Sequence, residues 1–222
     1  PGLDGITWDG ELLFPTMGGY EEKGVGIIER TYRTPEELPK TLASVHNGFA
    51  PAFKDANLRF FYSMEMKIDK DKSPYVIDPT IRHAAPGTSA IQTEAITNFA
   101  AVVRGLATGE KTLPIMPKKY AAAASLHSPE AEKSWVNITF PKDMRQWIKF
   151  RCACNHGSDY YAVPGFDGVG TVIALGDTVR EAVEAVKERV GEVKATSLSN
   201  NAKDLDAIME NINKGKLLGI AF

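Results

Sequence analysis

The sequence has little cysteine and no excess of charge of either sign. Its 222 residues include two cysteines, Cys152 and Cys154, and 26 basic against 28 acidic residues, a formal net charge of -2. We therefore expect no nucleic acid and no anionic membrane as a partner, and any bound anion must be held by a few local groups. The cysteines stand two positions apart, which on one strand does not allow a relaxed disulfide, so a reducing, cytoplasmic setting is expected.

A long apolar run is also absent, which argues against a membrane-spanning protein, and the 43% hydrophobic and 24% charged residues are typical of a soluble globular protein. The sequence opens on Pro1 with no initiator Met and no apolar signal core. We interpret this as a fragment of a longer protein.

The first half of the sequence alternates strand-like and helix-like segments. Short β-prone runs in residues 5–32 are interrupted by glycines, including a break at Gly18-Gly19, and Thr34-Pro35-Glu36-Glu37 has the form of a capping box. The expected elements are a hairpin and a further strand within residues 5–32, a helix at 35–53, paired antiparallel strands at 58–69 and 75–77, and an Ala-rich helix at 89–108 that ends at Gly109.

Two prolines, Pro114 and Pro117, interrupt both helix and strand ladders and predict a domain boundary, with units at 1–115 and 116–222. A second capping box begins at Thr178. In the second unit we expect strands at 120–126, 136–140, 148–154 and 170–175, a helix from Thr178 and a last helix at 203–212. The fold class is therefore α+β.

The most informative pair of polar residues is Glu65 on the first strand of the second hairpin and Asp78 at the end of its partner strand. Adjacent antiparallel strands place two such side chains together on one face. Two carboxylates suit Mg²⁺, which takes one or two protein ligands and completes its shell with phosphate oxygens and water. Arg82, four residues after Asp78, could donate to a phosphoryl oxygen. Exposed carboxylates near turns are common, so the spacing alone is also compatible with two surface carboxylates that bind no ligand.

Residues 59–69 and 74–82, followed by a Pro86-Gly87 loop, resemble the catalytic end of ATP-grasp enzymes. In that superfamily an acidic residue on one strand and a Glu-x-Asn on the next hold the magnesium ions of ATP. The resemblance implies that Glu65 and Asp78 are metal ligands, that Thr80 occupies the Asn position, and that Arg82 binds phosphate or substrate.

The similarity extends to the glycinamide ribonucleotide synthetase family, the phosphoribosylamine-glycine ligases of purine biosynthesis. Residues 9–38 resemble a shortened phosphate-side segment of that family, with Lys23 at its basic position, and residues 171–182, with Leu175-Gly176-Asp177-Thr178, are similar to the start of its closing helix. The order of these short motifs, rather than any one of them, carries the resemblance.

This resemblance implies a C-terminal ATP-grasp subdomain, incomplete, followed by a small α+β domain. It implies ATP and Mg²⁺ (or Mn²⁺) as cofactors, acid and amine substrates joined through an acylphosphate, and a preceding N-terminal part of the same protein as a necessary partner. Lys23, Glu65 and Asp78 would bind the cofactors, Lys23 and Arg82 would act in catalysis, and the fragment alone would be inactive. The oligomeric state is left open.

Three positions depart from the family pattern: Asp78 is one methylene shorter than Glu, Thr80 replaces an amide, and Pro79 lies between them. Two alternatives therefore stay open beside the glycine ligase. One is an ATP-grasp ligase for another acid and amine, and the other is a binding or scaffold protein that has lost catalysis.

Other polar motifs are weaker candidates. Cys152, Cys154 and His156 lie too close together to surround zinc without a distant fourth ligand, so we favour two packed thiols on a strand. His83, next to Arg82, is the one histidine with a functional case. The Gly-rich residues 165–170 precede a strand and are interpreted as a loop, because a dinucleotide fingerprint opens a helix.

Overall fold

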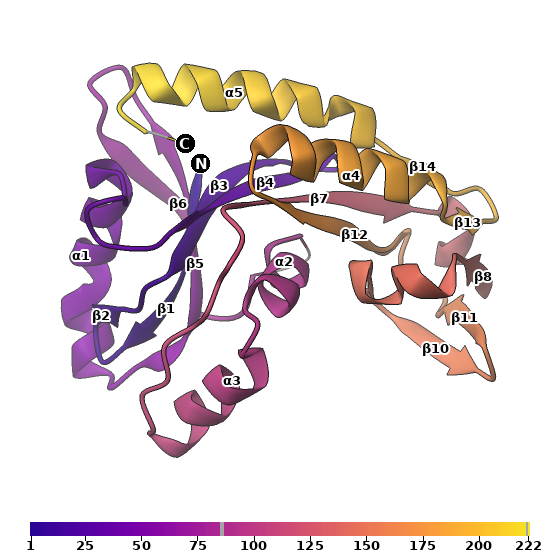
Figure 1. Ribbon diagram of the computed structural model, residues 1–222, viewed down its shortest axis with the longest axis horizontal. Coiled ribbons are helices and arrows are strands. Elements are labelled where there is room, and N and C mark those ends of the chain that lie inside the picture. The colour runs from indigo at the N-terminus through magenta and orange to yellow at the C-terminus, as the bar shows by residue number, and fades with distance from the viewer. Residues whose placement is uncertain (85–86, 221) are drawn as a thin grey trace.

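The computed structural model describes residues 1–84, 87–220 and 222 of the chain. A ten-stranded antiparallel sheet runs through the molecule (Figure 1), with strand order β6-β5-β1-β3-β4-β7-β12-β9, while β2 pairs with β1 and β14 with β7. Its strands are β1 (Gly2–Trp8), β2 (Glu11–Leu12), β3 (Thr16–Glu22), β4 (Gly26–Tyr32), β5 (Arg59–Ile68), β6 (Pro74–Thr80), β7 (Tyr120–His127), β9 (Ile148–Phe150), β12 (Gly168–Gly176) and β14 (Ser199–Asn200). A second, four-stranded sheet contains β10 (Ala153–His156), β11 (Asp159–Ala162), β8 (Val136–Thr139) and β13 (Lys194–Ala195), in that order.

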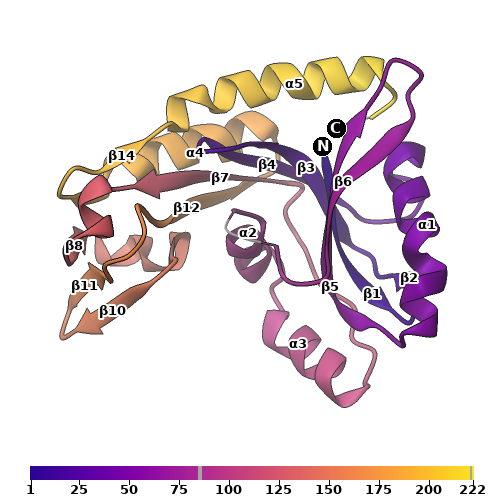
Figure 2. The same cartoon turned by 180° about the vertical axis from the view of Figure 1, so that it is seen from behind.

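Helices cover both faces of the large sheet. On β4, Ile28 contributes to the core beneath α4 (Val179–Gly191) and α5 (Leu205–Leu217), whereas its neighbour Ile27 contributes to the core beneath α2 (Gly87–Ala95) and α3 (Phe99–Thr108). The helix α1 (Lys40–Asp55) packs on the α4 and α5 face, farther along the sheet (Figures 1 and 2). The described residues also form three short 3₁₀ helices: η1 (Pro129–Glu132), η2 (Lys142–Trp147) and η3 (Ala202–Asp204). The predicted α+β class, an antiparallel sheet with packed helices, is confirmed.

Strand β7 lies at the centre of this arrangement. Ala121 to Ala124 are completely buried, because their small side chains let helices approach both faces of the strand. Strand β7 pairs with β4 on one side and β12 on the other, so one sheet contains strands from both sides of the predicted boundary at residue 115. The division into two domains stays a prediction.

The expected break at Gly18-Gly19 is wrong, because both glycines lie inside β3. A Cβ on Gly19 would come 2.3 Å from the carbonyl oxygen of Ile28, and one on Gly18 would come 2.9 Å from that of Gly2. The glycines therefore allow the neighbouring strands to approach closely. Interpreting paired glycines as a chain break misses this role.

The first helix begins at Lys40, after Pro39, and not at Pro35 as predicted. The carboxylate of Glu37 accepts the backbone N–H of Arg33 at 3.1 Å, within a chain of turns that precedes the helix. The predicted helix at 89–108 is two helices, because Asn98 accepts the N–H of Ile115 and donates to the carbonyl of Leu113, which fixes the chain between them. The predicted end at Gly109 is confirmed, with φ at +81°.

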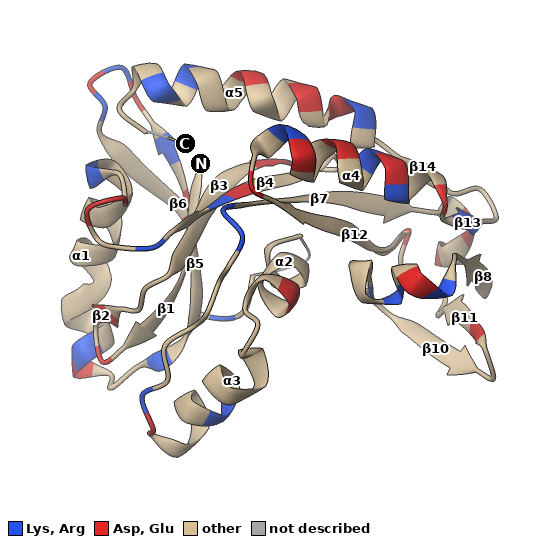
Figure 3. Ribbon diagram, in the orientation of Figure 1, with Lys and Arg blue, Asp and Glu red and all other residues tan. Residues whose placement is uncertain are grey.

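Helices α4 and α5 carry charged residues of both signs on their outer surfaces (Figure 3). Lys187 on α4 forms an ion pair with Asp206 on α5 at 2.9 Å, and this ion pair links the two helices. Among the described residues, no helix has the length and apolar character needed to cross a bilayer.

The capping box of α4 is confirmed: the Thr178 hydroxyl accepts the Glu181 N–H, and the Glu181 carboxylate accepts the Thr178 N–H. We expect Thr178→Ala to lower the free energy of unfolding by about 1 kcal/mol, because one helical N–H loses its partner. Urea unfolding would measure this loss. As a control, Thr108→Ala removes only a hydroxyl bonded to the Arg104 carbonyl and should change stability by less than about 0.5 kcal/mol. Equal effects of the two substitutions would contradict the capping role.

Candidate functional site

The hairpin of β5 and β6 positions the predicted metal ligands. Glu65 and Asp78 are direct partners across the two antiparallel strands, as are Ser63 and Thr80. Directly paired residues point to the same side of a sheet, so the two carboxylates share the face that carries α2. A bulge directly after Glu65 shifts the register of the rest of the hairpin.

All five predicted site residues line one pocket of about 510 Å³. Lys23 comes from the turn between β3 and β4, Glu65 from β5, Asp78 and Thr80 from β6, and Arg82 from the segment after β6. The pocket also contains residues that the sequence interpretation did not include, Asp4, Glu21, Ser125, His127 and Arg151 among them. Pro86 of the expected Pro-Gly loop lies outside the described residues, and Gly87 begins α2.

Two carboxyl groups in this region are buried: Asp4 on β1, which lines the pocket, and Glu29 on β4. Burial raises the pKa of Asp4 to about 6, and burial together with the charge of Asp4 raises the pKa of Glu29 well above its usual range. Thr88 on α2 donates to Glu29 at 2.6 Å. We infer that Glu29 keeps its proton near neutral pH and donates it to Asp4, which gives both buried carboxyls a partner.

Glu21 adds a further negative group nearer the surface. Burial raises its pKa, the charge of Glu65 raises it further, and the charge of Lys23 opposes both effects. The pocket lining therefore combines the carboxyl groups of Asp4 and Glu21 with the exposed cationic groups of Lys23 and Arg82.

The donor set of the pocket fits a hard divalent cation. Glu65, Asp78 and Thr80 offer oxygen atoms, the ligands that Mg²⁺ prefers. No cluster of three or more His, Cys, Asp or Glu residues able to hold a metal occurs within residues 1–84, 87–220 and 222. Such a cation would therefore need further oxygens from a phosphate ligand or water, the usual situation for Mg²⁺.

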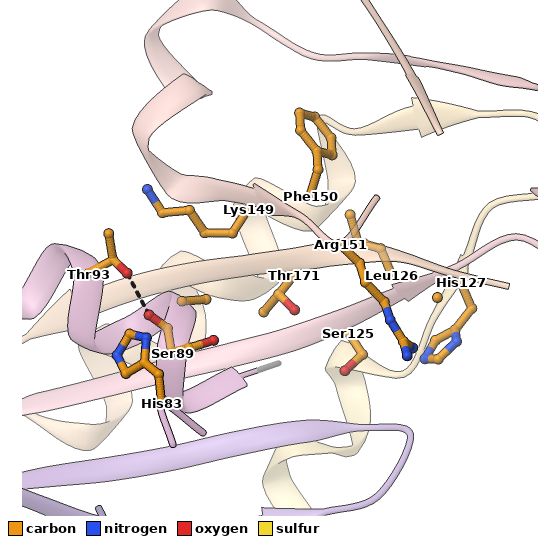
Figure 4. A pocket seen from close by; sticks show the side chains of 13 residues that line it. His83, Ser89, Thr93, Ser125, Leu126, His127, Lys149, Phe150, Arg151 and Thr171 are labelled. Atoms are coloured by element: carbon orange, nitrogen blue, oxygen red, sulfur yellow. Dashed lines mark hydrogen bonds between the residues drawn. The ribbon is translucent and has the colours of Figure 1, made fainter. Parts of the chain in front are cut away.

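A second pocket of about 380 Å³ lies beside the first and shares Ser125, His127 and Arg151 with it (Figure 4). It is bounded by α2 and by the ends of β7, β9 and β12. Lys149 on β9 forms an ion pair with Glu94 on α2, and His127 lies 3.4 Å from the carboxylate of Asp167. Sequence reasoning missed this pocket, because its residues are scattered along the chain and carry no motif.

His83 also lines this second pocket, with its ring 4.5 Å from that of Phe61 and 5.6 Å from that of Phe99. Burial lowers its pKa, so it is neutral near pH 7. Cys152 and Cys154 are exposed, and the packing expected for them is wrong, because the β10 hairpin lies at the edge of the molecule (Figure 1).

The arrangement of sheet, helices and hairpin is the ATP-grasp fold, as known structures show. No protein-family model and no curated protein matches the sequence. The structure is similar to that of phosphoribosylamine–glycine ligase from Thermotoga maritima, with a TM-score of 0.68 and 18% identity over 90% of this chain and 54% of that one. It is also similar to a biotin carboxylase in a β,γ-ATP complex from Campylobacter jejuni, with a TM-score of 0.59 and 12% identity over 91% of this chain and 47% of that one.

A third similar structure is N5-carboxyaminoimidazole ribonucleotide synthetase from Thermotoga maritima, with a TM-score of 0.56 and 13% identity over 88% of this chain and 52% of that one. The chain thus spans about half the length of each enzyme (54%, 47% and 52%). At these identities the similarity establishes the fold that the sequence resemblance predicted.

Proposed function

We propose that the chain is the phosphate- and metal-binding part of an ATP-dependent carboxylate–amine ligase of the phosphoribosylamine–glycine ligase type. One observation carries the proposal: Lys23, Glu65, Asp78, Thr80 and Arg82, from separate segments, line one pocket. The ATP-grasp fold supports it, since the similar structures are ATP-dependent ligases.

The reaction has two steps. A carboxylate oxygen of the acid attacks the γ-phosphorus of ATP, the bond from that phosphorus to the β-phosphate oxygen breaks, and ADP leaves. The amine nitrogen then attacks the acyl carbon of the acylphosphate, inorganic phosphate leaves, and the nitrogen loses a proton.

Each predicted site residue has a role in this scheme. Glu65 and Asp78, assisted by the Thr80 hydroxyl, would hold Mg²⁺ or Mn²⁺, which neutralises phosphate charge when bound. Lys23 and Arg82 line the same pocket and would donate to the phosphoryl oxygens. Purine biosynthesis, with glycine and phosphoribosylamine as the acid and amine, belongs to this proposal.

The metal site is tested by nucleotide binding. We expect calorimetric titration to show that Glu65→Gln and Asp78→Asn each weaken magnesium–ATP about tenfold, the effect of losing one charged ligand. Binding of ATP without metal should be unchanged or stronger. Lys23→Ala and Arg82→Ala should weaken ATP with and without metal, since they act on phosphate directly.

The exposed Glu210→Gln on α5 provides the control, with no expected effect. Magnesium tripolyphosphate is a second ligand, because it needs only the phosphate end of the site. The proposal fails if wild type binds neither ligand, or if the two carboxylate variants behave like Glu210→Gln. Either result would favour the alternative of a binding or scaffold protein that has lost catalysis. With the preceding N-terminal part that the family resemblance implies, ADP release with glycine and phosphoribosylamine would distinguish the glycine ligase from a ligase for another acid and amine.

A further inference from the structure

The pocket beneath α2 has the features of a site for a small organic anion. Lys149, Thr171 and Ser125 are direct partners across β9, β12 and β7, so their side chains form a row on one face of the sheet. Figure 4 shows this row in the pocket, with Arg151 extending toward Ser125 and His127 at one end and His83 at the other.

Of the cationic side chains that line this pocket, Arg151 is the one available to bind an anion. Lys149 is neutralised by Glu94, and His127 faces Asp167. The guanidinium of Arg151 lies 4.7 Å from the centre of the Phe166 ring and forms no ion pair with any of the described residues. A single guanidinium without a carboxylate partner matches one monoanionic group, which it can bind through two parallel hydrogen bonds.

Two buried polar atoms in the pocket also need a partner. Thr171 is only 1% exposed and lines the pocket, yet its hydroxyl has no hydrogen-bond partner among the described residues, and the same is true of His127 Nε2. A buried polar group without a partner is costly, and a ligand hydroxyl or amine would remove that cost. Phe150 and Leu126 supply apolar wall around these groups.

The position of Arg151 relates this pocket to the nucleotide pocket, because Arg151, Ser125 and His127 line both. We propose, on the basis of the proposed function, that the second pocket binds the acid substrate, a small hydroxy or amino acid whose carboxylate is held by Arg151 and whose second polar group meets Thr171. The carboxylate then lies at the opening between the pockets, on the side where the γ-phosphate would be.

The proposal is tested with glycolate, which has a carboxylate and a hydroxyl, against acetate, which lacks the hydroxyl, and glycolamide, which lacks the charge. The 222-residue chain, with magnesium and a non-hydrolysable ATP analogue, is titrated with each probe while the backbone amide signals of Thr171 and Ser125 are followed by NMR. We expect glycolate to bind more tightly than acetate, and glycolamide to cause no shift at matched concentration.

Two variants assign the contacts. Arg151→Gln should weaken glycolate and acetate at least tenfold and should weaken the nucleotide analogue by a smaller factor, because Arg151 also lines the nucleotide pocket. Thr171→Val should remove the preference for glycolate over acetate. Arg180→Gln, an exposed arginine on α4, is the matched control and should change none of these values.

The results separate this proposal from the proposed function. If the nucleotide analogue binds but glycolate does not shift the amide signals of Thr171 and Ser125, the acid site is overturned and the proposed function is not. A loss of nucleotide affinity in Arg151→Gln as large as its loss of glycolate affinity would assign this residue to the triphosphate and overturn the acid site too. Tighter binding of inorganic phosphate than of glycolate would also overturn it. If the nucleotide does not bind, the proposed function fails, and titration with glycolate alone still decides whether the pocket binds a carboxylate.

Discussion

Replacing Gly26 with alanine is expected to lower the free energy of unfolding by about 4 kcal/mol, or about 10 °C in Tm for a chain of this size. Gly26 lies in β4 opposite Ala124 of β7. A Cβ at this position would stand 1.9 Å from the carbonyl oxygen of Ala123 and 3.0 Å from its carbonyl carbon. These are backbone atoms of a completely buried residue, so they can move away only if the β4–β7 pairing opens.

The cost is large because this pairing joins the two parts of the sheet. The strands from β6 to β4 lie on one side of it, and β7, β12 and β9 lie on the other. Chemical unfolding followed by circular dichroism would measure the loss.

Gly48 provides a control of opposite sign, because it is an exposed glycine in α1 with no heavy atom within 4 Å of an added Cβ. Gly48→Ala should stabilise the protein by about 0.5–1 kcal/mol through helix propensity. If Gly26→Ala were as stable as wild type, the close approach of β4 to β7 would be wrong.

The sequence predicted those parts of the site that depend on local geometry. Glu65 and Asp78 flank one short turn, so their alignment follows from hairpin pairing, and the structure pairs them directly. The helix after Thr178 was likewise predicted from a cap only four residues long. The roles assigned to these carboxylates stay predictions.

The residues that were missed depend on long-range packing. Asp4 and Glu29 come from strands that are not neighbours in the sheet. Arg151, directly after β9, and Ser125 on β7 line the same pocket because β9, β12 and β7 align. Glu29 did carry a signal, since it is an acidic residue that directly follows Ile27-Ile28 in a segment with strand-like sequence. Such a residue in a buried strand requires a partner that the sequence alone does not identify.

Replacing Glu29 with glutamine is expected to make the stability of the protein less dependent on pH. In the unfolded chain a glutamate titrates near pH 4.3, whereas burial and the charge of Asp4 raise the folded-state pKa of Glu29 well above that value. Between these two pKa values the folded state holds a proton that the unfolded state has lost. The stabilisation is therefore complete below the unfolded pKa and is lost as pH rises through the folded pKa, by at most about 1.4 kcal/mol per pH unit for one group.

Asp4 contributes in the same direction, because its pKa is raised to about 6 by burial. A glutamine at position 29 can accept the Thr88 hydroxyl and donate its amide N–H to Asp4, so it keeps both contacts without a titrating proton. The glutamine amide should also favour the charged form of Asp4 and so reduce the pH dependence of stability that comes from Asp4. We therefore expect Glu29→Gln to be more stable than wild type at pH 8, with a difference that shrinks toward pH 4.

Urea unfolding at pH 5, 6, 7 and 8 measures how the free energy of unfolding changes with pH in wild type and in Glu29→Gln. The pKa values of His46 and His83 are lowered by burial, which makes stability rise with pH, but this effect is common to both proteins and cancels in the comparison. Glu29→Ala is the matched variant, because it removes the titration and also both contacts, and it should be less stable than Glu29→Gln at every pH. Parallel pH profiles for wild type and Glu29→Gln would show that Glu29 is ionised in the folded protein and that Asp4 finds its proton elsewhere.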